Sequence, residues 1–376
     1  MVWFMIETKF VDEELKLTCR NPLFVVLLFF MGTVFSFGQG NPVTIAPNDP
    51  RIQYSGRVDF TNPQAPRFDW PKVTITAAFR GKSIGILLED GGNNYDAYLD
   101  GKLHQVLVTK SGMVQYDLKD LSGGRHLLQL VKRTEASWGI VVFKGLVLEK
   151  NEALEEPPPG PQRRIEIIGD SLSCGYGNEG LRIQCDDLRP YQNSDKTYGA
   201  FLARDFDAEC RIIAISGKGV VRNWGAKDRT SPDPMPPYYQ QTLARDPGLK
   251  WDFKLWVPDA VFVFLGTNDF STSPQADPAV FSSNYRALLK TIRKNYPKAR
   301  IFCLGRSDLP NMGGLVEKIV QAEAKKTGKK ISYLAIPPFD YRDLGCDGHP
   351  KVATHRQMAD VLSPIFSKVM KWDKKN

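Results

Sequence analysis

The pattern of apolar and polar positions divides the chain into two regions. Between residues 41 and 152, short apolar runs that alternate with polar positions are separated by turn signals such as Asp90-Gly91-Gly92 and Ser122-Gly123-Gly124. No long helical pattern lies between these runs. The region is therefore predicted to be an antiparallel β-sandwich. Its expected strands cover residues 73–79, 83–90, 95–101, 104–110, 124–133 and 138–150.

The pattern changes after residue 163, where continuous apolar runs alternate with amphipathic segments of helical period. The apolar runs, at 164–170, 211–216, 260–266, 300–305 and 331–336, are expected to be strands. Helices are expected at about 197–207, 279–296, 313–328 and 350–371. Apolar strands that alternate with helices are typical of a parallel sheet covered on both faces, so residues 163–373 are predicted to form an α/β/α sandwich. Four prolines within 153–162 predict a stiff linker between the two domains.

The first 38 residues are typical of a signal peptide. Residues 23–37, LFVVLLFFMGTVFSF, are almost wholly apolar, follow Lys16 and Arg20, and end at small residues. This run is shorter than the ~20 apolar residues that span a bilayer, and a retained membrane anchor is the alternative. We expect removal of residues 1–38, a secreted or periplasmic protein, and no stable membrane association afterwards.

The charge and the cysteines of the chain indicate which ligands and which disulfide to expect. The chain carries 50 Lys and Arg against 42 Asp and Glu, a net charge of +8, but the basic residues are scattered, which argues against nucleic-acid binding. No grouping of Cys, His and carboxylates has metal-ligand spacing, so neither a metal nor another cofactor is expected. Cys174 and Cys185 are the pair expected to form a disulfide in an exported protein, whereas Cys210 and Cys303 are expected to be buried thiols.

Polar residues that the fold alone does not require follow three of the predicted parallel strands. Ser171 follows 164–170, Gly217 follows 211–216, and Asn268 follows 260–266. Ligand sites of such sheets lie at the carboxyl ends of the strands, where these residues would meet. A serine needs a base to become a nucleophile, and His349 at the start of the last helix can be that base. The N–H groups of Ser171 and Gly217 and the Asn268 amide can then hold the oxyanion of a tetrahedral intermediate.

Each of these motifs also has a purely structural interpretation. Gly169-Asp170-Ser171 can be a turn with a helix cap, and Gly266-Thr267-Asn268-Asp269 can be a turn rich in side-chain hydrogen bonds. His355, inside the last helix, is the competing base. The joint occurrence of the motifs in this order favours a serine hydrolase. The substrate-binding candidates near this site are Trp224, Asp170 and Asn223.

The motifs GDSLS (169–173), SG (216–217), GTND (266–269) and DGHP (347–350) resemble the four blocks of the SGNH hydrolase superfamily. The resemblance implies that Ser171 is the nucleophile, Gly217 and Asn268 are oxyanion-hole donors, and His349 is the base. The catalytic acid of that family commonly lies three residues before the histidine, a position that Cys346 occupies here. Three groups can therefore orient the base, namely Asp347, which we favour, Asp343, or a backbone carbonyl.

The order of the two domains is similar to that of carbohydrate esterase family two, secreted bacterial acetylesterases with a jelly-roll domain before the SGNH domain. Gly56-Arg57-Val58-Asp59 and Gly345-Cys346-Asp347 are among the stretches that carry this narrower resemblance. It implies a jelly-roll-like first domain and removal of acetyl groups from plant polysaccharides or oligosaccharides, such as those of xylan and glucomannan, through an acetyl-enzyme on Ser171. The alternatives are a lipase or thioesterase that acts on other acyl esters, and a carbohydrate-binding protein with a vestigial hydrolase site.

Overall fold

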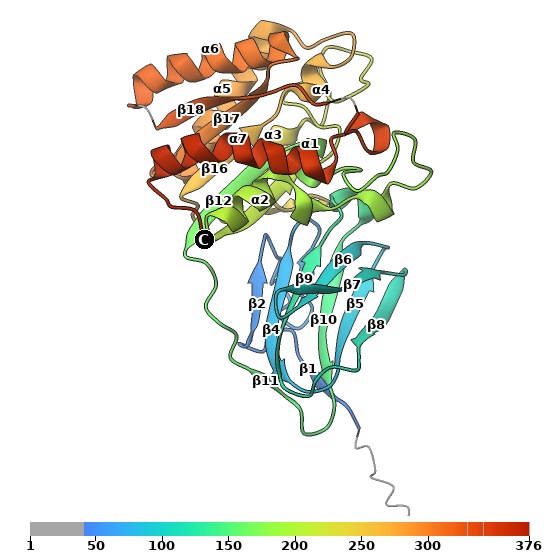
Figure 1. The fold of residues 1–376 in the computed structure, drawn as a ribbon. Coiled ribbons are helices and arrows are strands. Elements are labelled where there is room, and N and C mark those ends of the chain that lie inside the picture. Colours follow the sequence, from blue (N-terminus) through green and yellow to red (C-terminus); the bar gives the residue numbers. More distant parts are fainter. Residues whose placement is uncertain (1–40, 329, 341, 376) are drawn as a thin grey trace, which may run out of the picture. The chain divides into compact units, whose positions relative to one another are not determined.

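The structure is a computed structural model that describes residues 41–328, 330–340 and 342–375. The expected signal peptide, residues 1–38, lies outside the described residues. The chain from residue 41 onward belongs to one compact unit, which contains a β-sandwich followed by an α/β/α sandwich (Figure 1). Within the described residues, no helix combines the length and the apolar character that a membrane span needs.

The N-terminal domain consists of two antiparallel sheets. Its strands are β1 Val43–Ile45, β2 Ile52–Ser55, β3 Arg67–Phe68, β4 Thr74–Arg80, β5 Ile84–Asp90, β6 Asn94–Leu99, β7 Lys102–Val108, β8 Gly112–Leu118, β9 Arg125–Lys132, β10 Val141–Leu148 and β11 Ala153–Glu155. One sheet has the order β1-β10-β5-β8 with β3 also paired to β10, and the other has the order β11-β4-β9-β6-β7 with β2 paired to β4. Burial alternates along β10, so its buried side chains pack between the sheets. The predicted β-sandwich is confirmed.

Some strands of this domain were not expected from the sequence. The edge strand β8 was not expected, although apolar and polar residues alternate along it from Val114 to Leu118. The prediction of a linker over 153–162 is wrong for its first three residues, which form β11 and pair with Ala78–Arg80 of β4. The reason is Leu154, whose side chain is buried in the core of the sandwich.

The C-terminal domain is built on a five-stranded parallel sheet. Its strands are β12 Arg163–Gly169, β13 Ala208–Ala214, β16 Ala260–Phe264, β17 Arg300–Arg306 and β18 Ile331–Ile336, and a separate hairpin is formed by β14 Gln241–Leu243 and β15 Asp246–Lys250. The helices are α1 Ser171–Cys174, α2 Tyr198–Asp205, α3 Met235–Tyr238, α4 Thr267–Phe270, α5 Pro278–Asn295, α6 Pro310–Thr327 and α7 Val352–Met370. Short 3-10 helices cover Ala136–Trp138, Arg189–Tyr191, Ser194–Lys196 and Cys346–Gly348.

The helices cover both faces of this sheet, as predicted. The strand order is β13-β12-β16-β17-β18, and every residue of the central strand β16 is buried. Helix α2 packs against α7, and α5 packs against α6 (Figure 1).

The register of the strands brings the candidate residues to one edge of the sheet. Gly169, the last residue of β12, lies opposite Ala214 of β13 and Phe264 of β16. The candidate nucleophile and the two candidate oxyanion-hole residues follow these three positions by two to four residues. Because the strands are parallel and end together, short extensions from all three meet above the same edge.

Candidate active site

Ser171 lies in the first turn after β12. Asp170 is the N-cap of α1, and its carboxylate accepts a hydrogen bond from the Leu172 N–H at 3.1 Å. The turn is tight, because a Cβ atom on Gly169 would lie 2.0 Å from the Ser173 hydroxyl oxygen. Only glycine fits at this position. The turn holds the Ser171 side chain at the carboxyl edge of the sheet.

His349 lies beside Ser171. Its Nε2 atom is 2.8 Å from Ser171 Oγ, within reach for transfer of the serine proton. The histidine follows the 3-10 helix Cys346–Gly348 and precedes α7. Burial lowers the pKa of His349 from its ordinary value, against the opposing effects of the Cys346 carbonyl and the Asp347 charge. The imidazole is therefore neutral near pH 7 and able to accept a proton.

The other ring nitrogen of His349 faces a backbone carbonyl. The Nδ1 atom lies 3.3 Å from the carbonyl oxygen of Cys346. Since a carbonyl can only accept, Nδ1 carries the proton and Nε2 is the basic nitrogen. The Asp347 carboxylate instead accepts a hydrogen bond from the Tyr176 hydroxyl at 2.8 Å. Asp347 has a φ of 52°, a left-handed turn conformation, and its side chain faces Tyr176. The expectation that Asp347 orients His349 therefore does not match this geometry.

The remaining rivals for these roles are structural residues. Asp343 accepts hydrogen bonds from the backbone N–H of Thr354, at 3.1 Å, and from the Thr354 hydroxyl, so it caps helix α7. His355 is buried, accepts a hydrogen bond from the Tyr198 N–H at 3.3 Å, and has its pKa lowered by burial to about 3. Neither side chain contacts the serine.

The three predicted oxyanion donors line one cavity. Among the described residues, the N–H groups of Ser171 and Gly217 have no protein acceptor, so both are available to a ligand. The Asn268 amide nitrogen donates to the Lys218 carbonyl at 2.9 Å and to the Asp170 carboxylate at 3.2 Å. Both N–H bonds of the Asn268 amide are thus engaged with protein acceptors at the edge of the cavity.

The cavity has a volume of about 570 Å³, and Trp224 lies on its wall with 66% of its surface exposed. This exposed indole is free to stack on a sugar ring. The two other predicted substrate-binding residues do not suit that role. Asp170 is fully buried, and burial raises its pKa to about 7. Asn223 donates to the Asp233 carboxylate at 2.8 Å and so stabilises its own loop.

Arg306 and Phe339 are among the side chains of the cavity wall that the sequence analysis missed. Arg306 is the last residue of β17, and its guanidinium lies 4.5 Å from the centre of the Phe339 ring. Asp308 pairs with this guanidinium at 2.5 Å. The position of Arg306 at the carboxyl end of a parallel strand was a signal that could have identified it.

Asp269 organises the loop that follows Gly217. Its carboxylate accepts hydrogen bonds from the backbone N–H groups of Val220, Val221 and Arg222 at 2.8–2.9 Å. Burial raises the pKa of Asp269, an effect that these three donors oppose. The last residue of the GTND motif is therefore a structural support of the site.

The structure pairs Cys185 with Cys346, so the expected Cys174–Cys185 disulfide is wrong. Cys174 is a buried thiol in α1, whereas Cys185 lies in a surface loop that reaches the turn before the candidate base. Cys210 and Cys303 are buried thiols, as predicted. The disulfide ties that turn to the segment after α1.

Comparison with known families agrees with the two-domain organisation. Residues 54–158 match the carbohydrate esterase 2 N-terminal model, and residues 167–356 match the GDSL-like lipase/acylhydrolase family.

Two related proteins extend this match over most of the chain. The cellulase/esterase CelE of Acetivibrio thermocellus is 35% identical over 334 residues, which are 86% of this chain but only 40% of CelE. An acetylxylan esterase / glucomannan deacetylase of Cellvibrio japonicus is 32% identical over 310 residues, 78% of this chain and 83% of that protein.

A solved structure shows the same arrangement of both domains. A family two carbohydrate esterase from Clostridium thermocellum, in complex with cellohexaose, superposes with a TM-score of 0.80 at 34% identity, and the match covers 85% of this chain and 99% of that one. Both domains, their order and the sequence identity over most of the chain thus point to one family. The chain belongs to carbohydrate esterase family 2, with a GDSL-like hydrolase domain that follows the family's β-rich domain.

Proposed function

We propose that this protein is a secreted or periplasmic serine esterase that removes acetyl groups from plant cell-wall polysaccharides such as xylan and glucomannan. The observation that carries the proposal is the 2.8 Å contact between Ser171 Oγ and His349 Nε2 at a cavity bordered by the exposed Trp224. The name of the Cellvibrio japonicus relative, an acetylxylan esterase / glucomannan deacetylase, supports the substrate class. The apolar segment 23–37 supports export.

The proposed reaction begins when Ser171 Oγ attacks the acetyl carbonyl carbon and His349 Nε2 takes the hydroxyl proton. The resulting oxyanion accepts hydrogen bonds from the N–H groups of Ser171 and Gly217. Asn268 becomes the third donor when it exchanges its longer contact, the 3.2 Å bond to Asp170, for the oxyanion. The bond between the acetyl carbon and the sugar oxygen then breaks, and the sugar oxygen receives the proton from His349.

In the second half of the reaction, water attacks the acetyl-enzyme. His349 takes a proton from the water and returns it to Ser171 Oγ, and acetate leaves. Throughout both halves the Nδ1–H group of His349 donates to the Cys346 carbonyl, whose partial negative charge stabilises the imidazolium. The base is thus oriented by the main chain.

The test is a panel of acetylated xylan, acetylated glucomannan, 4-nitrophenyl acetate and 4-nitrophenyl esters of long acyl chains. We expect acetate release from the polymers and a preference for acetyl over longer chains. Ser171→Ala should lower kcat by about 10⁴-fold or more, because the nucleophile has no substitute. The matched control is Ser173→Ala, since the Ser173 hydroxyl contacts the buried Tyr198 hydroxyl at 2.9 Å instead of the cavity.

An organophosphonate that labels serine hydrolases should modify Ser171. Labelling at Ser173 would contradict the assignment of the nucleophile. A wild-type protein that binds these polysaccharides and hydrolyses none of the esters would contradict the esterase and favour a carbohydrate-binding protein.

A further inference from the structure

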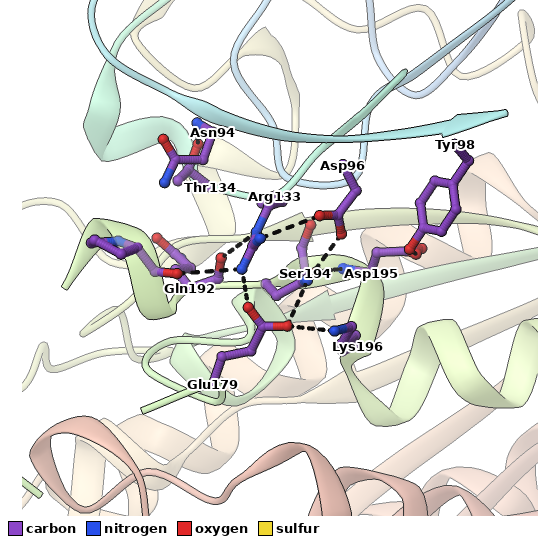
Figure 2. A network of polar contacts seen from close by, with 12 residues as sticks. Asn94, Asp96, Tyr98, Arg133, Thr134, Glu179, Gln192, Ser194, Asp195 and Lys196 are labelled. Atoms are coloured by element: carbon purple, nitrogen blue, oxygen red, sulfur yellow. Dashed lines mark hydrogen bonds and ion pairs between the residues drawn. The ribbon is translucent and has the colours of Figure 1, made fainter. Parts of the chain in front are cut away.

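The segment Lys132–Glu135, which begins at the last residue of β9, is anchored between the β-sandwich and the hydrolase domain. Figure 2 shows the Arg133 guanidinium between two carboxylates, those of Asp96 in the sandwich and Glu179 in the hydrolase domain. Asn193 donates to both carboxylates, at 3.0 and 3.1 Å. Because this network is largely buried, the segment has a defined position relative to the hydrolase domain.

Glu135 extends from this segment to the loop after β13. Its carboxylate is 2% exposed and accepts a hydrogen bond from the Ser216 N–H at 2.6 Å. The Cys174 thiol lies 3.5 Å from the same oxygen. The fully buried Lys132 ammonium donates to the Glu135 carbonyl at 3.1 Å. The carboxylate therefore cannot move without breaking buried hydrogen bonds.

Gly217, which directly follows Ser216, depends on hydrogen bonds for its position. It has a φ of 76°, and a Cβ atom there would meet no atom within 4 Å, so packing does not hold it. On one side the Ser216 N–H is bound by Glu135, and on the other side the Trp224 N–H donates to the Gly217 carbonyl at 2.8 Å. With the Lys218 N–H, which donates to the Ile215 carbonyl at 3.4 Å and closes the turn, these two bonds fix the backbone on both sides of the Gly217 N–H.

We propose that Glu135 of the β-sandwich is a positioning residue that, through Ser216, holds the Gly217 N–H toward the oxyanion. This inference rests on the proposed esterase function. A hydrogen bond from a backbone N–H to a carboxylate is among the stronger ones in proteins, and preorientation of donors is what an oxyanion hole contributes to catalysis. The β-sandwich is then part of the catalytic unit in addition to any role in binding polysaccharide.

The experiment compares Glu135→Ala and Glu135→Gln with the wild type on 4-nitrophenyl acetate, which needs no sugar contacts. Glu135→Ala should lower kcat about 10–100-fold, less than the roughly 10²–10³-fold that loss of an oxyanion donor costs, with KM within about threefold of wild type. Glu135→Gln should recover most of this loss, because an amide oxygen accepts the same hydrogen bond and the side chain fills the same space.

The matched control is Ser55→Ala. The Ser55 hydroxyl donates to the Glu209 carboxylate at 2.6 Å, which is another contact between the domains but lies at the opposite end of β13 from Ser216. This variant should lower Tm and leave both kcat and KM unchanged. It shows what loss of an interdomain hydrogen bond does by itself.

Two kinetic outcomes would overturn the inference: a Glu135→Ala protein with a lower Tm and a wild-type kcat, or a Glu135→Gln protein that loses as much kcat as Glu135→Ala. Amide hydrogen exchange separates this failure from failure of the proposed function. Protection of the Ser216 N–H should be lost in Glu135→Ala and kept in Glu135→Gln even if the wild type hydrolyses no ester. Equal protection in all three proteins would also overturn the inference.

Discussion

Replacement of Asp347 by asparagine distinguishes the two ways in which His349 can be oriented. If the carboxylate held Nδ1–H, the amide would favour the wrong tautomer and kcat would fall about 10⁴-fold, the loss known for a serine protease triad. In this structure Nδ1 lies 3.3 Å from the Cys346 carbonyl, and the Asp347 carboxylate accepts from Tyr176. An asparagine retains an oxygen that can accept the Tyr176 hydrogen bond, and it leaves the Cys346 carbonyl in place.

The expected magnitude follows from the exposure of Asp347. Its side chain lies at the surface, so its charge acts on His349 through solvent. Interactions of exposed charge pairs are worth about 0–1 kcal/mol, which corresponds to at most about a fivefold change in rate. We therefore expect kcat of Asp347→Asn within about fivefold of wild type. The Asp347 charge raises the pKa of His349, against the larger effect of burial. Removal of this charge should therefore move the acidic limb of the pH profile to a slightly lower pH.

The assay measures kcat and kcat/KM for 4-nitrophenyl acetate across the acidic to neutral range. Asp343→Asn is the control, because it weakens the cap of α7 and should lower the free energy of unfolding by about 0.5–2 kcal/mol while kcat stays near wild type. A loss of about 10³-fold or more in a folded Asp347→Asn protein would refute orientation of the base by the backbone. The same loss in Asp343→Asn alone would transfer the role to that residue.

Three further predictions concern pH, the disulfide and the substrate. Because burial lowers the pKa of His349, activity should persist as the pH falls through ~6.5 and be lost only at lower pH. An acidic limb of the kcat/KM profile with a pKa at or above the ordinary histidine value would contradict a buried His349. Cys185→Ser, which removes the bond to Cys346, should lower the free energy of unfolding measured in urea by about 2–4 kcal/mol, and equal midpoints would show that the disulfide does not form. Trp224→Ala should raise KM for acetylated polysaccharide roughly tenfold and leave KM for 4-nitrophenyl acetate unchanged. The control Leu255→Ala, which truncates another exposed apolar side chain, should change KM for neither substrate. Equal effects of Trp224→Ala on both substrates would exclude stacking on the polymer.

The sequence by itself determined the two-domain architecture and the location of the candidate site. Burial on both faces produces a continuous apolar run such as that of β16. A sandwich strand buried on one face produces alternation, as in the first four residues of β4, so both signals are local and can be read along the chain. Ser171 and Asn268 could be placed together because they follow strands of one parallel sheet, whose carboxyl ends meet at one edge. The edge strand β8, which is exposed on one face, carries the same alternation from Val114 to Leu118 but was not recognised from the sequence.

Only the tertiary structure decided which groups support these residues. The hydrogen bond from the Ser216 N–H to the Glu135 carboxylate joins positions 81 residues apart, and the Cys185–Cys346 disulfide joins positions 161 residues apart. Such pairings depend on how the domains and loops pack, and nothing in the local pattern around either partner specifies the other. The same holds for His349, since a backbone carbonyl is present at every residue. Which carbonyl faces Nδ1 is set by the conformation of the turn and not by the identity of its side chains.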